Sequence, residues 1–183
     1  MIQLYQKINT LKVLSHFFKD PYTGFYLREL ARILDMDPMT VKRALDLLVN
    51  DGFLEKYREK NLILYRADMN NPHFTFAKVS HSLSIIYDQK IVHHIMEKVS
   101  GLICIVLYGS VSKGEDDPES DLDLLIIGGS MDKNLVSFDL PWEFNPVFMT
   151  LDEWDDTYHE NRGYYDEIIR TGINLHGNMP VIE

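Results

Sequence analysis

Two carboxylates and a small-residue turn lie close together in the second half of the chain. Gly109-Ser110 ends one apolar run, and Asp121 and Asp123 begin the next. Alternate residues of a strand point to the same face, so both carboxylates would leave one face of a sheet. Charges placed at the start of a buried strand are costly unless something binds them. Carboxylate oxygens with open positions suit Mg²⁺ (or Mn²⁺), which keeps waters and is shared with phosphates, so Asp121 and Asp123 are the predicted metal ligands.

The turn before the acids has the residues of a phosphate site. Gly109 lets the backbone bend sharply and approach a ligand closely. The hydroxyl of Ser110 and the following amides can donate to phosphate oxygens, and Lys113 is near enough in sequence to reach the same oxygens. Positioning and charge neutralisation are what phosphoryl chemistry needs. The alternative is that the aspartates only cap a strand and that "KGEDDPESD" is a solvated loop.

The elements that would position these residues alternate between strands and helices. Buried-type strands are predicted at 102–109, 121–127 and 142–150, with a last short strand in "INLHG". A helix is expected from Leu151, because Thr150 and Glu153 have the spacing of a capping box. Another helix is expected in "GYYDEIIRTG". Gly109 would then end the first of these strands, and Asp121 would begin the second.

The pattern Gly109-Ser110 followed by Asp121-Leu122-Asp123 resembles the signature of the polymerase-beta-type nucleotidyltransferase superfamily. The run "LYGSVSKGEDDPESDLDLLII" is similar to its minimal, stand-alone branch, and "IIRTGINLHG" resembles the final helix and strand of that branch. The likeness covers roughly Val99 to Gly177. It implies a small mixed sheet flanked by helices, with an NTP such as ATP and Mg²⁺ bound by Gly109, Ser110, Asp121 and Asp123.

One position departs from that family pattern. Active members carry a third carboxylate on a neighbouring strand, and the matching residue of "WEFNPVFMT" is Asn145, give or take one. An asparagine can offer an oxygen to a metal, but it cannot accept a proton from a nucleophile at neutral pH. Glu143 is two residues earlier, hence on the same face, and is the alternative candidate for this catalytic position.

The first third of the chain predicts three helices and a hairpin. Asp37 is expected to cap the third helix, with Pro38 at its first position. Two strand-like runs, "FLEKYREK" and "NLILYRAD", follow. The residues at helical spacing are Leu4, Ile8, Leu11 and Leu14; Leu27, Leu30, Ala31 and Leu34; and Val41, Ala44, Leu45 and Leu48. The run "YLRELARILDMDPMTVKRALDLLVNDGFLEKY" resembles the winged-helix family of archaeal and bacterial regulators, which implies a winged helix-turn-helix.

Basic and polar residues on this module are candidate DNA contacts. In a helix-turn-helix the second helix of the pair lies in the major groove, and basic wing residues meet phosphate. The candidates are Thr40, Lys42, Arg43, Arg58 and Lys60. The alternative is that these are solvated charges on a module used for dimerisation or protein contact. The net charge of residues 1–70 is only +2, so this part has no strongly basic patch.

The whole chain is expected to be an α+β protein in three parts. These are a winged helix-turn-helix domain at 1–70, a helical linker at 71–98 and a nucleotidyltransferase-like domain at 99–183. The net charge of −10 divides into +2 for residues 1–70 and −12 for the rest, which indicates two electrostatic tasks. The N-terminus lacks the apolar core of a secretory signal, and no stretch is apolar enough to span a membrane, so a cytoplasmic location is expected.

Two functions follow from these features. The first is an enzyme that moves a nucleoside monophosphate from an NTP to a hydroxyl on a protein, a nucleic-acid end or a small molecule. The family resemblance adds a toxin partner as one such acceptor, which would make the chain antitoxin-like. The second is a DNA-binding regulator whose nucleotidyltransferase-like half only senses a nucleotide. A symmetric homodimer is compatible with either, with Phe17 and Phe18 as a candidate contact.

Overall fold

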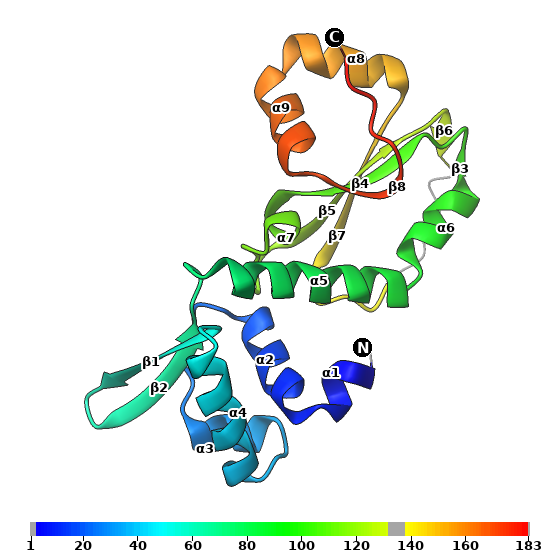
Figure 1. Ribbon diagram of the computed structural model, residues 1–183. Helices are drawn as coiled ribbons and strands as arrows, with labels where there is room; N and C mark the ends of the chain where they lie inside the picture. Colours follow the sequence, from blue (N-terminus) through cyan, green and yellow to red (C-terminus); the bar gives the residue numbers. More distant parts are fainter. Residues whose placement is uncertain (1–2, 132–137, 183) are drawn as a thin grey trace. The chain divides into compact units, whose positions relative to one another are not determined.

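The computed structural model describes residues 3–131 and 138–182 (Figure 1). The chain divides into two compact units, Met1–Ser84 and Ile85–Glu183, and the boundary falls inside helix α5 (Pro72–Asp88). The predicted helical linker, residues 71–98, is therefore shared between the two units. Among the described residues, no helix combines the length and the apolar character that a membrane crossing requires.

The N-terminal unit contains short helices followed by one hairpin. Strands β1 and β2 pair in an antiparallel register from Leu54 opposite Ala67 to Glu59 opposite Leu62. Buried apolar residues of α2, α3, α4 and the hairpin form one core with Phe74 of α5. The elements are α1 (Gln3–Lys7), α2 (Asn9–Lys19), α3 (Leu27–Ile33), α4 (Pro38–Asn50), β1 (Leu54–Glu59) and β2 (Leu62–Ala67), followed by α5. The sequence predicts three helices before the hairpin, whereas residues 3–67 contain four, because the first predicted helix is divided into α1 and α2.

Helix α4 begins where its capping residues predict. The Asp37 carboxylate accepts hydrogen bonds from the backbone N–H groups of Met39 at 3.0 Å and Thr40 at 3.1 Å, and Pro38 occupies the first turn. These bonds satisfy donors that the first turn of any helix leaves open. The four predicted inward residues of α4 are all buried: Val41, Ala44, Leu45 and Leu48.

Two predictions for the N-terminal segment are wrong. Ile8 interrupts the expected first helix with an extended backbone (φ −94°, ψ 111°) and is 46% exposed, so α1 and α2 are separate helices. Its branched Cβ favours extended backbone, which the apolar spacing alone does not reveal. Phe17 and Phe18 are buried, with Phe17 packed against Phe25 and Phe18 against Phe74. Both rings belong to the core and offer no surface for a dimer contact.

The C-terminal unit is built on a four-stranded mixed sheet in the order β7-β5-β4-β8. Strand β4 is antiparallel to β5 and β8, whereas β5 and β7 are parallel. A small antiparallel pair, β3 with β6, lies outside this sheet. The elements are α6 (Ile91–Lys98), β3 (Val99–Ser100), β4 (Cys104–Tyr108), α7 (Gly109–Lys113), β5 (Asp121–Ile127), β6 (Ser130–Met131), β7 (Glu143–Met149), α8 (Leu151–Glu160), α9 (Arg162–Thr171) and β8 (Ile173–Gly177). The predicted α+β class with a small mixed sheet is confirmed.

Helices α8 and α9 cover one face of the sheet (Figure 1). Trp154 of α8 and Tyr165 and Ile168 of α9 are buried against residues of β4 and β5. The capping box predicted for α8 is present, since the Thr150 hydroxyl accepts from the Glu153 N–H and the Glu153 carboxylate accepts from the Thr150 N–H. The residues that these helices cover on the sheet are Cys104, Val106, Leu125 and Ile127.

Candidate active site

Strands β5 and β7 bring four polar side chains together at one end of the sheet. Their parallel register places Asp121 beside Glu143 and Asp123 beside Asn145. Register partners in neighbouring strands, and alternate residues along each strand, share a face. All four predicted catalytic or metal-binding positions of these strands therefore lie on one face, the face that α8 and α9 cover farther along. Asp123 is half-buried and the other three are exposed.

Asp123 is the most perturbed carboxylate of this group. Burial raises its pKa, the hydrogen bond that Asn145 Nδ2 donates to Asp123 Oδ1 at 2.8 Å lowers it, and the charge of Asp121 raises it again. The net direction is upward. A bound cation would act the other way, because a nearby positive charge favours the ionised carboxylate. The ionised form of Asp123 is therefore disfavoured in the folded protein, and a cation bound beside Asp121 and Asp123 would stabilise it.

Gly109 contacts the Asp123 carboxylate directly. Its φ of +74° lies in the left-handed region, where L side chains are strained. A Cβ built on Gly109 would also lie 2.4 Å from Asp123 Oδ2, well inside van der Waals contact. Strand β4 ends at Tyr108, whose register partner in β5 is Asp123. The Gly-Ser turn and the acid pair are therefore parts of one site, with Ser110 half-buried in the first turn of α7.

Lys113, the predicted phosphate contact, has an ionic partner in the structure. Its Nζ atom lies 2.5 Å from Oε1 of Glu167 in α9. This hydrogen bond lowers the pKa of Glu167. The lysine is near the Gly-Ser turn as expected, but its ammonium group is already engaged by a carboxylate. The pairing spans α7 and α9, and no local pattern in the sequence indicates Glu167.

A second contact that sequence reasoning missed anchors the start of β7. Asp116, in the loop after α7, is only 3% exposed, and its Oδ2 accepts a hydrogen bond from Nε1 of Trp142 at 3.0 Å. Trp142 immediately precedes Glu143, so this bond holds the beginning of β7 beside the acid pair. The segment "KGEDDPESD" is accordingly not solvated throughout. Its one deeply buried acid is indistinguishable in sequence from its exposed neighbours, such as Glu115 and Glu119.

The donor set fits a cation that takes few protein ligands. Within residues 3–131 and 138–182, no group of three or more histidine, cysteine, aspartate or glutamate side chains is arranged to hold a metal. Two carboxylates on one face with open positions match the needs of Mg²⁺, which binds through one or two carboxylates and otherwise takes waters and substrate phosphates. Asp121 and Asp123 are the residues that would hold such an ion.

The comparison with protein families agrees with this geometry. Residues 89–169 match the family model of the nucleotidyltransferase domain. The matched segment contains the Gly-Ser turn, both aspartates and the β7 residues beside them. It supports nucleotidyl transfer as the general activity of this domain and implies an NTP as its substrate. No curated protein matches the chain.

The candidate DNA contacts lie outside that match, and the winged helix-turn-helix stays a prediction. On α4 the Thr40 hydroxyl lies 3.4 Å from the capping Asp37 carboxylate, and Lys42 pairs with Asp46 at 2.8 Å. Arg43 is exposed on the same helix. Arg58 lies in β1, and Lys60 lies in the hairpin turn with a φ of +53°; both are exposed. Two of the five candidates thus have a polar partner within their own helix or its cap.

Proposed function

We propose that the nucleotidyltransferase domain transfers a nucleoside monophosphate from an NTP to a hydroxyl group and releases pyrophosphate. The observation that carries this proposal is the β5–β7 register, which gathers Asp121, Asp123, Glu143 and Asn145 on one face beside Gly109. A divalent ion held by Asp121 and Asp123 would supply neutralisation of the phosphate charge. The groups that bind the phosphates and accept the proton are side chains and backbone amides of this chain.

The turn at the end of β4 is suited to hold the phosphates. Gly109 has no side chain between the backbone and the Asp123 carboxylate, so a phosphate can approach both. The Ser110 hydroxyl and the amides of the turn donate to the phosphate oxygens. Lys113 lies at the end of α7, where Glu167 limits its reach. Binding of the triphosphate therefore rests mainly on the turn and the acid pair.

Glu143 is the proposed general base. Asn145 is the register partner of Asp123, but its amide cannot accept a proton at neutral pH. Its Nδ2 donates a hydrogen bond to the Asp123 carboxylate. Glu143 is the carboxylate beside Asp121 on the same face. It takes the proton of the acceptor hydroxyl as that oxygen attacks the α-phosphorus. The bond from the α-phosphorus to the bridging oxygen breaks, and pyrophosphate leaves with the electron pair.

Transfer of α-phosphate label from an NTP tests the proposal. The wild-type protein, with Mg²⁺, is expected to move label from at least one α-labelled NTP to an acceptor in a cell extract. Asp121→Asn with Asp123→Asn should abolish the transfer, because both changes keep shape and remove charge. Asp152→Asn with Asp155→Asn, which removes two charges from α8, is the matched control and should retain it. Equal transfer by both double variants would contradict the proposal.

The second candidate is a DNA-binding regulator with a nucleotide-sensing domain. It is favoured by Asn145, because an amide in place of a carboxylate leaves binding groups but removes a base. The exposed Arg43, Arg58 and Lys60 are its proposed phosphate contacts. Nucleotide binding without label transfer, together with a salt-sensitive shift of the DNA upstream of the coding sequence, would support this candidate. Label transfer lost with the aspartates supports the enzyme.

A further inference from the structure

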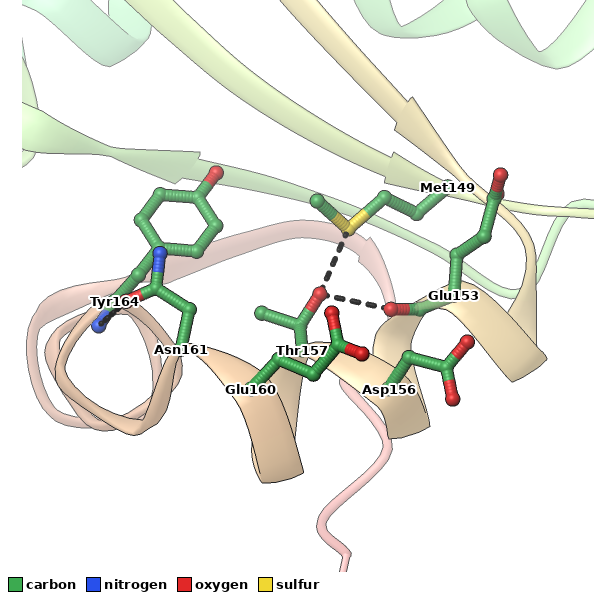
Figure 2. Close-up of a pocket in the computed structure, with 7 residues that line it drawn as sticks. All are labelled: Met149, Glu153, Asp156, Thr157, Glu160, Asn161 and Tyr164. Carbon is green, nitrogen blue, oxygen red and sulfur yellow. Dashed lines mark hydrogen bonds between the residues drawn. The ribbon is translucent and has the colours of Figure 1, made fainter.

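Helix α9 contacts the chain on both sides of the Gly-Ser turn. Asn161 caps α9 by accepting a hydrogen bond from the Tyr164 N–H at 3.4 Å, and the Tyr164 ring points from the helix toward the sheet (Figure 2). The Tyr164 hydroxyl donates to the Tyr108 hydroxyl, at the end of β4, at 3.0 Å. One turn later along α9, Glu167 lies 2.5 Å from Nζ of Lys113, the last residue of α7. These contacts place the Glu167 carboxylate beside the proposed phosphate site.

The Glu167 carboxylate and the candidate metal ligand Asp123 act on the same two hydroxyl groups. Burial raises the pKa of Tyr108 and Tyr164, and the charges of Asp123 and Glu167 raise the pKa of both further. Because electrostatic effects weaken with distance, both carboxylates lie close to this tyrosine pair. A triphosphate at the Gly-Ser turn would therefore approach Glu167 as a group of like charge.

Lys113 is placed to contact the phosphates once Glu167 releases it. At about 1.5 Å per residue of helix, Lys113 lies about 6 Å along the α7 axis from Gly109. Its side chain is 30% exposed, so the ammonium group is accessible to a ligand. A triphosphate carries several negative charges and offers several oxygens to the three N–H donors of a lysine, whereas Glu167 offers one carboxylate. Exchange of the carboxylate for phosphate is therefore favourable for the lysine.

Separation of the Lys113–Glu167 pair costs little. The Glu167 side chain is 45% exposed, and ion pairs with this degree of exposure contribute little to stability. The hydrogen bond from Lys113 lowers the pKa of Glu167 most, and the charge of Arg170 lowers it further. Arg170 lies three residues farther along α9, at the spacing of neighbours on a helix surface. A cation thus remains beside the carboxylate when Lys113 leaves.

We propose that Glu167 sets the affinity of the nucleotide site by competing with the triphosphate for Lys113. In the nucleotide-free protein Glu167 holds the ammonium group. When the nucleotide binds, Lys113 exchanges this carboxylate for phosphate oxygens, and Glu167 stays beside Arg170. This inference rests on the proposed nucleotide site and adds to it a residue that regulates its affinity. A carboxylate that instead held Lys113 ready for the phosphates would have the opposite effect on affinity.

Calorimetric titration of the intact protein with ATP, GTP, CTP and UTP in Mg²⁺ tests the competition. Glu167→Gln should lower the Kd of the nucleotide that binds by about three- to fivefold, because the competing carboxylate is lost. Asp166→Asn is the matched control: it removes one charge from the same helix, where Asp166 pairs with Arg162 at 2.9 Å, and should change the Kd by less than about twofold. A Kd that Glu167→Gln leaves unchanged or raises would overturn the inference.

A double-mutant cycle with Lys113→Met separates competition for the lysine from repulsion of the phosphates. Without the lysine, Glu167→Gln should change the Kd by less than about twofold. Equal tightening with and without Lys113 would show direct repulsion by Glu167 and would overturn the exchange. Failure of both the wild type and Glu167→Gln to bind any of the four nucleotides would overturn the proposed nucleotide site itself.

Discussion

Three residues of the candidate site, Gly109, Asn145 and Asp121, influence the carboxylate of Asp123. Gly109 packs against its carboxylate, Asn145 donates to it, and the charge of Asp121 lies beside it. Burial and the neighbouring charge raise its pKa despite the hydrogen bond. Because folding disfavours the ionised form of Asp123, this residue lowers the stability of the ligand-free protein at neutral pH. Such destabilising residues are common at binding sites, where the ligand offsets the loss of stability.

The raised pKa of Asp123 predicts that Asp123→Asn stabilises the metal-free protein. Folding favours the protonated carboxyl, so between the ordinary pKa of 3.8 and the higher folded value the folded state binds more protons than the unfolded one. The stability contributed by this group therefore falls as pH rises through that window. Urea unfolding in EDTA at pH 7 should show a higher midpoint for the variant, and the difference should vanish below pH 3.8. A less stable variant at pH 7 would contradict this reading.

Gly109→Ala should cost the fold about 1–3 kcal/mol and weaken metal-dependent binding of nucleotide. The new Cβ meets both an unfavourable φ and the Asp123 carboxylate. Gly163→Ala is the matched control, because a Cβ there contacts nothing within 4 Å and the residue lies in α9. That change should leave stability unchanged or raise it by about 0.4–1 kcal/mol. Two variants with the same urea midpoint would refute the argument for Gly109.

Asn145→Asp restores the carboxylate of the family pattern. This variant tests whether the general base is the residue at position 145 or Glu143. If Asn145 limits turnover, the variant should transfer label faster by about 10²-fold or more at saturating metal. Glu143→Gln, assayed in both backgrounds, shows which carboxylate takes the proton. We expect Glu143→Gln to slow the wild-type protein by about 10²–10⁴-fold, as loss of a general base does. A wild-type rate unaffected by Glu143→Gln would remove Glu143 from the mechanism.

At the scale of elements, helix starts could be predicted from residues close in sequence, whereas contacts between segments far apart in the chain could not. Asp37 and Thr150 mark helix starts through side-chain bonds to residues within one turn, so both caps are readable from sequence. The Asp116–Trp142 and Lys113–Glu167 contacts join segments far apart in the chain, and only the folded sheet brings them together. Sequence alternation placed Glu143 and Asn145 on one face. The β5–β7 register decided which aspartate each one faces.

Helix α5 contains a histidine that predicts acid sensitivity of the N-terminal unit. His81 is 4% exposed and packs against the rings of Tyr5 and Phe18. Burial, with help from the charges of Lys19 and Lys78, lowers its pKa from 6.5 to about 4. The unfolded state therefore binds more protons between these values, and stability falls as pH drops through them.

The expected loss between pH 6.5 and pH 4 is up to about 3 kcal/mol, measured by urea unfolding followed by circular dichroism. His81→Gln should remove most of this pH dependence. His73→Gln, at an exposed position of the same helix, should retain it. Identical pH profiles for the wild type and both variants would show that His81 does not titrate as inferred.

At the scale of the whole molecule, the charge is divided between the two parts of the chain. Residues 1–70 carry a balance of +2 and the remainder −12. A strongly acidic C-terminal part is unfavourable for phosphate ligands unless cations accompany them, which agrees with a metal-dependent nucleotide site. The weak positive balance of the N-terminal part predicts at most a modest, salt-sensitive affinity for DNA.

The most direct measurement is calorimetric titration of the intact protein with ATP, GTP, CTP and UTP, each with and without Mg²⁺. The account predicts heat of binding for at least one nucleotide, a requirement for the metal, and loss of that heat in the variant with Asp121→Asn and Asp123→Asn. Absence of heat with all four nucleotides, or binding that the double variant leaves unchanged, would contradict the claim that the acid pair and the Gly-Ser turn form a metal–nucleotide site.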